Sequence, residues 1–280
     1  MRSIPGTWSL ASRTLCAAAL ALAIAGPAHS QQAPARKAPA AAESQAQARE
    51  ILMRMAGYLG GAPAYSVSLR AGYDAVQKSG QKIEFNESRK ITLSRPDKLR
   101  VEGERSDGAK TLTVFNGKEI VLVDAAQNVY AAVPQPGNLD ESITYFTGDL
   151  GMRLPLAVML LSRMSAEFEG RVKSVKYVEK ASVLGAPSHH IAARTDTVDF
   201  QVWVADGDKP VPLRVVITYK KSPGQPQFWA QFSDWNMAPP IADSTFTAQL
   251  PAGAQKVAFV AQLQRAPMAA GKKSADKGAK

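Results

Sequence analysis

The feature that most constrains the fold is an alternation of apolar and polar residues that begins at Tyr65 and recurs along most of the chain. In residues 198–204, for example, the even positions are apolar, whereas the odd positions carry Asp199, Gln201 and Trp203. Successive side chains of a strand point to opposite faces, so this period of two predicts strands with one buried face. We expect strands at residues 65–74, 81–95, 98–104, 110–115, 119–124, 128–132, 171–180, 187–194, 197–205, 212–220, 227–237 and 245–249.

A hairpin signal fixes how two of these strands pair. Asn116-Gly117 lies between the apolar runs at 112–115 and 120–123. Both residues tolerate a positive φ in a two-residue turn. The strands on either side are therefore expected to be antiparallel neighbours.

Two helices and one shorter segment complete the pattern. Apolar residues recur at steps of three and four over 43–59, and Gly60-Gly61 ends that helix. A second helix is expected at 155–168, where apolar residues on most sides indicate burial on more than one face. Residues 139–147 are expected to form one short amphipathic turn or helix. Many strands with few helices predict an α+β fold, with the helices on one side of a large antiparallel sheet.

The N-terminus has the pattern of an export signal. Arg2 and Arg13 precede an apolar run at 15–24, and Ala28-His29-Ser30 offers small residues for cleavage before Gln31. The apolar run is shorter than the roughly 20 residues that a spanning helix needs. We therefore expect residues 1–30 to be a cleaved signal peptide and the mature protein to be periplasmic.

Composition limits the remaining parts of the chain. Cys16 is the only cysteine and lies in the signal, so the mature chain has no disulfide or thiolate site. Residues 31–42 are expected to be a disordered leader, and 261–280 a basic disordered tail. Loss of Arg2 and Arg13 lowers the formal net charge from +10 to +8, which favours an anionic membrane surface or acidic partners. Export argues against nucleic acid as a partner.

The sequence offers no catalytic constellation. His189 and His190 are the histidines left after cleavage, and as neighbours on a strand they point to opposite faces. They cannot bind one metal ion together. The sequence also has no Gly-x-Ser-x-Gly elbow, phosphate loop, dinucleotide fingerprint or zinc spacing. We expect no cofactor, no metal and no enzymatic activity.

Aromatic residues mark the 227–237 strand on both faces. Trp229 and Trp235 are expected on one face, and Phe228 and Phe232 on the other. Both faces are then expected to be covered. Either these rings belong to an ordinary core, or one face lines a cavity for a ligand.

Several short motifs occur in an order found in a known superfamily. Arg95-Pro96-Asp97-Lys98 precedes the Asn116-Gly117-Lys118 hairpin, and Ser244-Thr245-Phe246-Thr247 leads to Pro251-Ala252-Gly253 near the end. This order resembles that of the LolA/LolB-like superfamily, the periplasmic carriers and acceptors of lipoproteins. The resemblance implies an incomplete β-barrel wrapped around helices, with a hydrophobic cavity between them, as a single domain at 43–260.

Within that superfamily, the chain is most similar to a family of predicted periplasmic proteins of unknown function. The residues that carry this likeness are Ser188-His189-His190-Ile191, Val198 to Trp203, Pro210 to Arg214, and Phe232 to Asn236.

The resemblance to the lipoprotein carrier implies a role for Arg95. In the carrier, the arginine of the Arg-Pro pair latches a helical lid over the cavity. A guanidinium has five donors and can hold several lid carbonyls at once. The alternative is a strand-end arginine in water. The longer middle segment of this chain departs from the carrier and puts lipoprotein trafficking itself in doubt.

These observations together predict a binding protein rather than an enzyme. The expected ligand is a lipid or the acyl chain of a lipoprotein, held between sheet and helices, with 139–147 as a lid. A second hypothesis is an envelope regulator that binds a membrane protein, and a third is an enzyme that uses a histidine. The residues expected to line the cavity are Tyr145, Phe146, Leu156, Met159, Leu160 and Trp203.

Overall fold

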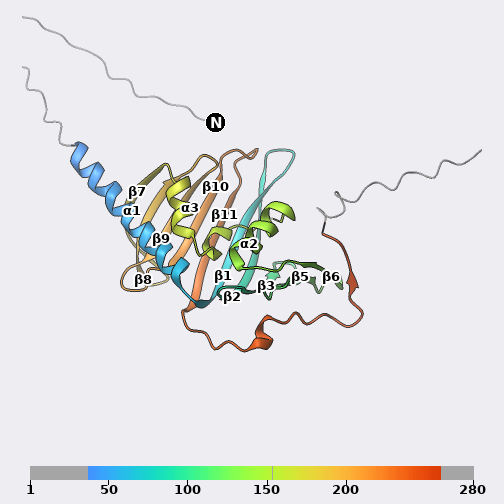
Figure 1. Ribbon diagram of the computed structural model, residues 1–280. Coiled ribbons are helices and arrows are strands. Elements are labelled where there is room, and N and C mark those ends of the chain that lie inside the picture. Colours follow the sequence, from blue (N-terminus) through green and yellow to red (C-terminus); the bar gives the residue numbers. More distant parts are fainter. Residues whose placement is uncertain (1–36, 153, 260–280) are drawn as a thin grey trace, which may run out of the picture. The chain divides into compact units, whose positions relative to one another are not determined.

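A computed structural model describes residues 37–152 and 154–259, and its main feature is one twelve-stranded sheet. The strand order is β12-β6-β5-β4-β3-β2-β1-β11-β10-β9-β8-β7, so β12 and β7 are the two edges. All neighbouring strands are antiparallel except β12 and β6, which are parallel. The predicted α+β fold with a large, curved, mainly antiparallel sheet is confirmed (Figure 1).

Eleven of the strands lie close to the predicted ranges. They are β1 (Ala64–Val76), β2 (Lys82–Ser94), β3 (Lys98–Arg105), β4 (Lys110–Phe115), β5 (Glu119–Asp124), β6 (Val129–Pro134), β7 (Ser174–Val183), β8 (Ala186–Arg194), β9 (Val198–Ala205), β10 (Pro212–Tyr219) and β11 (Gln227–Asn236). The hairpin of β4 and β5 is antiparallel as predicted, but its loop has three residues, 116–118, instead of two. Only Gly117 has a positive φ in this loop, and the Asn116 side chain accepts the backbone N–H groups of Lys118 and Glu119.

The sheet joins two halves of the chain through one pair of strands. β1 pairs with β2 on one side and with β11 on the other, so that Ser68 lies opposite both Lys90 and Ser233. The strands of the N-terminal half, β1 to β6, therefore continue directly into those of the C-terminal half, β7 to β11.

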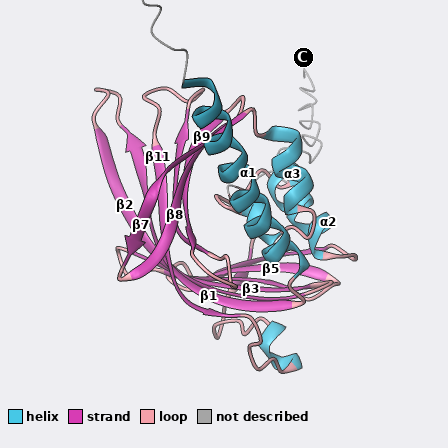
Figure 2. Cartoon of the chain, turned by 90° about the vertical axis from the view of Figure 1, so that its left-hand side faces the viewer, coloured by secondary structure: helices cyan, strands magenta, loops and turns pink. Residues whose placement is uncertain are grey.

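The helices lie on the concave face of the sheet (Figure 2). α1 (Lys37–Gly61) buries the predicted stripe, which includes Leu52, Met55 and Leu59, and it contacts β7, β8 and β9. α1 starts earlier than expected, so residues 37–42 are helical rather than part of a disordered leader. Residues 31–36 of that leader, the signal peptide at 1–30 and the basic tail at 261–280 lie outside the described residues.

The segment expected as a second long helix is interrupted. Leu156 has a left-handed backbone with a φ of 68°, and it is followed by one 3₁₀ turn, η2 (Ala157–Leu160). α3 (Met164–Arg171) then begins as a separate helix. The prediction of one continuous helix at 155–168 is wrong. These residues are apolar on nearly all sides because they fill space inside the concave face.

Residues 139–147 form the short helical segment that the sequence predicts. α2 (Leu139–Thr144) is capped by Asn138, whose side chain accepts the N–H of Glu141 while the Glu141 side chain accepts the N–H of Asn138. One π-helical turn, η1 (Tyr145–Asp149), continues it. No helix among the described residues is both long and apolar enough to cross a membrane.

The chain after β11 crosses the outer, convex face of the sheet (Figure 2). The strand expected at 245–249 is absent, and a 3₁₀ turn, η3 (Asp243–Phe246), lies over β3 instead. The side chain of Phe246 is only 4% exposed, and Arg100 donates to the Thr245 carbonyl oxygen at 3.3 Å. The alternation of apolar and polar residues at 245–249 is too short to make a strand here. A turn is enough to position the one ring that is buried. The last strand is β12 (Gln255–Lys256), which pairs with Val129 and Tyr130.

A pair of adjacent glycines tests the fit between α1 and the segment before α3. A Cβ atom on Gly60 would lie 2.5 Å from the Ser162 carbonyl oxygen, whereas one on Gly61 would have no neighbour within 4 Å. We expect Gly60→Ala to lower the free energy of unfolding by about 1–3 kcal/mol through overpacking. Gly61→Ala should leave it unchanged or raise it by up to about 1 kcal/mol. Equal effects of the two changes in urea unfolding would contradict this packing.

Candidate functional site

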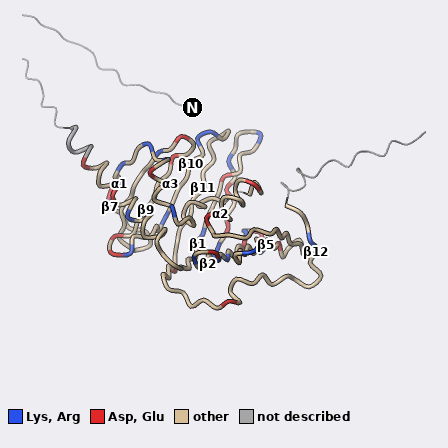
Figure 3. The backbone as a smooth tube through the Cα atoms, in the orientation of Figure 1, with Lys and Arg blue, Asp and Glu red and all other residues tan. Residues whose placement is uncertain are grey.

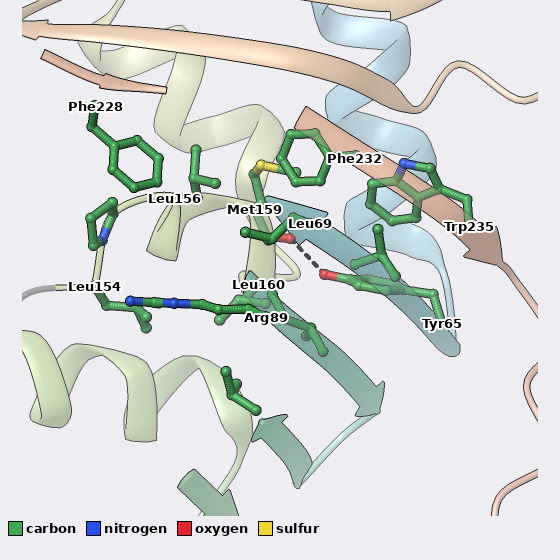
Figure 4. Close-up of a pocket in the computed structure, with 14 residues that line it drawn as sticks. Tyr65, Leu69, Arg89, Leu154, Leu156, Met159, Leu160, Phe228, Phe232 and Trp235 are labelled. Atoms are coloured by element: carbon green, nitrogen blue, oxygen red, sulfur yellow. Dashed lines mark hydrogen bonds between the residues drawn. The ribbon is translucent and has the colours of Figure 1, made fainter. Parts of the chain in front are cut away.

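The candidate site is the space between the concave face of the sheet and the segments that cover it. Its first part is a small, mainly apolar cavity of about 30 Å³, which we call the sheet cavity (Figure 4). Its walls come from β1, β2, β3 and β11 and from residues 154–160. The lining includes Tyr65, Leu69, Leu156, Met159, Phe232 and Trp235.

A second apolar cavity lies beneath α1 and α3. It has a volume of about 170 Å³, and we call it the helix cavity. Its polar lining residues are Arg171, Thr195 and Thr197. The apolar lining includes Met55, Phe168, Phe200, Val202, Val215 and Ile217.

One short segment separates the two cavities. Leu156 and Met159 line both of them, and both belong to residues 154–160, which we call the plug. The plug also borders an open cleft of about 740 Å³, the mouth, through Leu154 and Pro155. Phe228 lines the mouth and the sheet cavity. Residues of the plug therefore line the mouth and both cavities.

One buried contact holds the plug, and one exposed contact holds the residues after it. The Tyr65 hydroxyl donates to the Met159 carbonyl oxygen at 3.1 Å, a bond drawn in Figure 4. The Asp140 carboxylate of α2 accepts the Ser162 backbone N–H at 2.9 Å and the Ser162 hydroxyl at 2.7 Å. The segment that ends the plug is therefore tied both to the sheet and to α2.

Arg95 connects these contacts to the rim of the sheet. It directly follows β2, its Nε donates to the Ala62 carbonyl oxygen at 3.2 Å, and its Nη1 lies 3.7 Å from an Asp140 oxygen. The Arg95 and Asp140 side chains are 13% and 15% exposed, and the Nη2 of Arg95 has no hydrogen-bond partner among the described residues. Arg95 thus contacts the expected lid segment through a carboxylate rather than through several carbonyl oxygens. Its role as a latch stays a prediction.

The expected lining residues divide into three groups, of which the third is Trp203 alone. Leu156, Met159 and Leu160 line the sheet cavity. Tyr145 and Phe146 pack against the core but line neither cavity nor the mouth.

The prediction for Trp203 is wrong, because its side chain lies on the convex face. Trp203 is paired with His190 and stacks on its ring, with the ring centroids 4.0 Å apart. Arg214 lies over Trp203 at 5.7 Å and over Trp229 at 5.4 Å. These residues form a stack of aromatic rings and a cation that stabilises the outer face, remote from the cavities.

Strand β11 is irregular between Trp229 and Trp235, the two tryptophans that were expected on one face. Asp234 has a positive φ of 56°, and the pairing of β1 with β11 shifts between Ser66 and Ser68. This bulge moves Trp235 to the concave face, where its ring lies 5.5 Å from that of Tyr65. Trp229 stays on the convex face above Gly72. The expectation that both tryptophans share one face is wrong.

The histidines point to opposite faces as predicted. His189 pairs with Val204 of the core, and His190 pairs with Trp203 of the convex face. The His189 ring nitrogens lie 3.2 Å from the Tyr177 hydroxyl and 3.1 Å from an Asp206 oxygen. Burial, with smaller contributions from Asp206 and Glu179, raises the pKa of Tyr177. Within 37–152 and 154–259, no group of three His, Cys, Asp or Glu residues is arranged to bind a metal ion.

Tyr65 gives a test of the buried contact that holds the plug. Burial raises the pKa of its hydroxyl well above the usual value of about 10, and the positive charge of Arg95 only partly opposes this. Above a pH of about 10 the unfolded chain therefore binds fewer protons than the folded one, so stability falls as pH rises.

We expect Tyr65 to contribute about 1.4 kcal/mol of lost stability per pH unit in that range, and Tyr65→Phe to remove this contribution. Urea unfolding at a series of alkaline pH values measures it. Tyr73→Phe is the control, because the Tyr73 side chain is 41% exposed. An unchanged slope in Tyr65→Phe would show that the hydroxyl ionises freely in the folded state.

The structure is similar to several solved structures at low sequence identity. For the Mycobacterium tuberculosis lipoprotein LppX, the identity is 11% over 71% of this chain and 100% of that chain, with a TM-score of 0.46. A LolA superfamily protein, NE2245 from Nitrosomonas europaea, gives 13% identity over 72% and 97% of the two chains, with a TM-score of 0.37. The Pseudomonas aeruginosa MucA/MucB complex gives 17% identity over 72% and 61%, with a TM-score of 0.38. None of the curated proteins matches this sequence.

A family model covers most of the chain. The model described as a predicted periplasmic protein, DUF2092, matches residues 48–260. This match confirms the expected likeness to a family of predicted periplasmic proteins. The chain belongs to the DUF2092 family of predicted periplasmic proteins.

Proposed function

We propose that this protein binds an apolar ligand, a lipid or an acyl chain, in the space between sheet and helices and catalyses no reaction. The observation that carries the proposal is the plug. A single short segment lines both apolar cavities and the open mouth. A ligand that displaces the plug gains one continuous apolar site.

The cavity volumes indicate that binding needs this displacement. The helix cavity, at about 170 Å³, is smaller than the roughly 300–1,000 Å³ of typical ligand sites. The left-handed backbone of Leu156 favours movement, because such a conformation costs a non-glycine residue of order 1 kcal/mol or more. Each buried methylene of an acyl chain contributes about 0.8 kcal/mol, before ordering costs.

Arg95 and Asp140 are proposed to control the opening. Asp140 holds Ser162, which directly follows the plug and Leu161, and Arg95 lies against Asp140 in a nearly buried position. Opening would separate this ion pair and admit water. A ligand that binds the open form more tightly would then shift the population toward it.

The cellular setting is also part of the proposal. Residues 1–30 carry the pattern of a cleaved signal peptide, and the family is described as predicted periplasmic. An exported protein of this kind meets lipids, lipoproteins and membrane surfaces. We propose that its ligand comes from one of these sources in the bacterial envelope.

Two neighbouring residues of β10 test the location of the site. Val215 lines the helix cavity, whereas Val216 pairs with Gln201 on the convex face. We expect Val215→Phe to fill the cavity and weaken binding of a fluorescent fatty acid by about tenfold or more. Val216→Phe is the matched control and should bind as the unchanged protein does.

Both variants carry the same added volume. Val215→Phe is expected to lose about 1–3 kcal/mol of stability. Binding is therefore measured well below the unfolding temperature, where this loss does not affect it. Equal binding by the two variants would place the ligand elsewhere. Native mass spectrometry of the protein purified from periplasm, followed by lipid extraction, identifies the ligand. A mass without any adduct, together with a co-purified membrane protein, would favour an envelope regulator instead.

The ion pair gives a second test. Removing one partner of a nearly buried pair is expected to cost up to about 3–5 kcal/mol, so Asp140→Asn, which keeps the shape of the side chain, is the milder change. We expect Asp140→Asn to increase hydrogen exchange in 139–149 and 157–162 and to raise the association rate of the fatty acid. Asp97→Asn is the control, because Asp97 pairs with Lys98 at 3.5 Å at a more exposed site. Unchanged exchange and association in Asp140→Asn would overturn the latch.

A further inference from the structure

An exposed apolar patch lies on the hairpin of β1 and β2. Tyr73, Ile83 and Phe85 are 41%, 40% and 42% exposed. The strand register places Tyr73 opposite Phe85 and Ile83 opposite Ala75, so all three side chains share one face. The Tyr73 and Phe85 rings stack with their centroids 5.9 Å apart. The hairpin rises beyond α2, which leaves this face uncovered near its tip (Figure 1).

The loop between β10 and β11 lies beside the hairpin tip and forms one edge with it. Lys82 donates to the Gln225 carbonyl oxygen at 3.1 Å, and the Gln227 backbone N–H donates to Asp74 at 2.9 Å. A Cβ atom on Gly224 would lie 2.8 Å from a methyl carbon of Val76, so the loop backbone at Gly224 approaches the Val76 side chain closely. Residues far apart in the sequence therefore lie together at this end of the sheet.

The charges at this edge are mainly positive. Lys78 and Lys221 are exposed in the two loops, 77–81 and 220–226. Figure 3 shows basic residues, in blue, at the tip of the hairpin of β1 and β2. The nearby acids are already engaged, since Asp74 lies 3.6 Å from Lys82 and Glu84 accepts the indole N–H of Trp229 on the convex face. Two exposed lysines, which form no ion pair with any residue in 37–152 or 154–259, thus flank three exposed apolar side chains.

We infer that this edge docks on an anionic phospholipid membrane. The docking surface, which we call the hairpin edge, consists of Tyr73, Ile83, Phe85, Lys78 and Lys221. Aromatic side chains favour the interface between headgroups and acyl chains, and lysines are attracted to anionic headgroups. An anionic bilayer offers an apolar region for the three apolar side chains and negative headgroups for the two lysines, across the width of both loops.

The hairpin edge also lies next to the mouth. Tyr73 belongs to both, and Leu154 and Phe228 continue the mouth toward the sheet cavity. Docking would therefore turn the mouth toward the lipid surface. The inference goes beyond the proposed function and does not require it, because a protein with a filled helix cavity keeps the same hairpin edge.

Co-sedimentation of the full chain with vesicles tests the inference. The vesicles contain either equal parts of phosphatidylglycerol and phosphatidylcholine or phosphatidylcholine alone. We expect binding to the anionic vesicles that falls with added salt. The combined change Tyr73→Ser, Ile83→Ser and Phe85→Ser should weaken it by about tenfold or more. Lys78→Glu with Lys221→Glu should weaken it by about fivefold or more.

Matched controls come from the opposite end and edge of the sheet. Leu184 is 81% exposed in the turn between β7 and β8, so Leu184→Ser removes an apolar side chain that is more accessible than those of the hairpin edge. Lys176→Glu with Lys180→Glu makes the same change of charge on β7. Both controls should bind vesicles as the unchanged protein does, and the lysines near the C-terminus are common to all variants.

Two further measurements separate the possible outcomes. Phe85→Trp should show a blue-shifted emission on anionic vesicles. Val215→Phe should keep vesicle binding even where it loses the fatty acid, so failure of the two proposals can be distinguished. The inference is overturned if the unchanged protein does not bind anionic vesicles, or if the hairpin-edge variants bind as the controls do. Cross-linking of residue 85 to a protein, without vesicle binding, would assign the edge to a protein partner.

Discussion

The structure depends on the need to cover the concave face of a very wide sheet. This face carries an apolar residue at every second position of most strands, as shown by Leu69, Val202 and Phe232. Exposing it to water would forgo most of the hydrophobic stabilisation of the fold. The helices α1, α2 and α3 cover only part of it, and the irregular plug covers much of the rest. The cavities lie where these unequal pieces meet, so incomplete coverage is itself the origin of the candidate site.

The convex face is covered in a different way. Over β3 to β5 the segment that follows β11 lies across the sheet, and Phe246 is buried there. Over β8 to β11 the stack of His190, Trp203, Arg214 and Trp229 protects the face with side chains of its own strands. The two faces therefore differ in kind: the cleft of about 630 Å³ on the convex face is lined largely by polar and charged residues, whereas the two cavities of the concave face are mainly apolar.

The sequence predicts the parts of this arrangement that follow from local periodicity. Eleven strands, the start of α2 and the buried stripe of α1 all repeat with a regular step, and each was found close to its expected place. For Trp203 the sequence itself predicts the correct face, because its position in the alternation groups it with Asp199 and Gln201, away from the apolar face. Its size suggested a ligand contact that its position contradicts.

Other features depend on the tertiary structure and leave no periodic signal. The bulge at Asp234 changes the face of Trp235 by adding one residue to one strand of a pair. The break at Leu156 occurs in a run of good helix formers, because filling the concave face outweighs helical hydrogen bonds. Asp140 meets Arg95 and Ser162 only after three separate segments have folded together. Such contacts need the structure.

The seam between β1 and β11 has a consequence for how the protein reaches this structure. β1 is among the first strands to be made and β11 among the last, yet they are direct neighbours. Until β11 arrives, one edge of β1 offers unpaired backbone groups to any extended chain nearby. A topology with such distant partners also folds slowly. The half-made sheet is therefore the form most exposed to aggregation, and a chaperone that shields β1 would protect the molecule during the time it is most vulnerable.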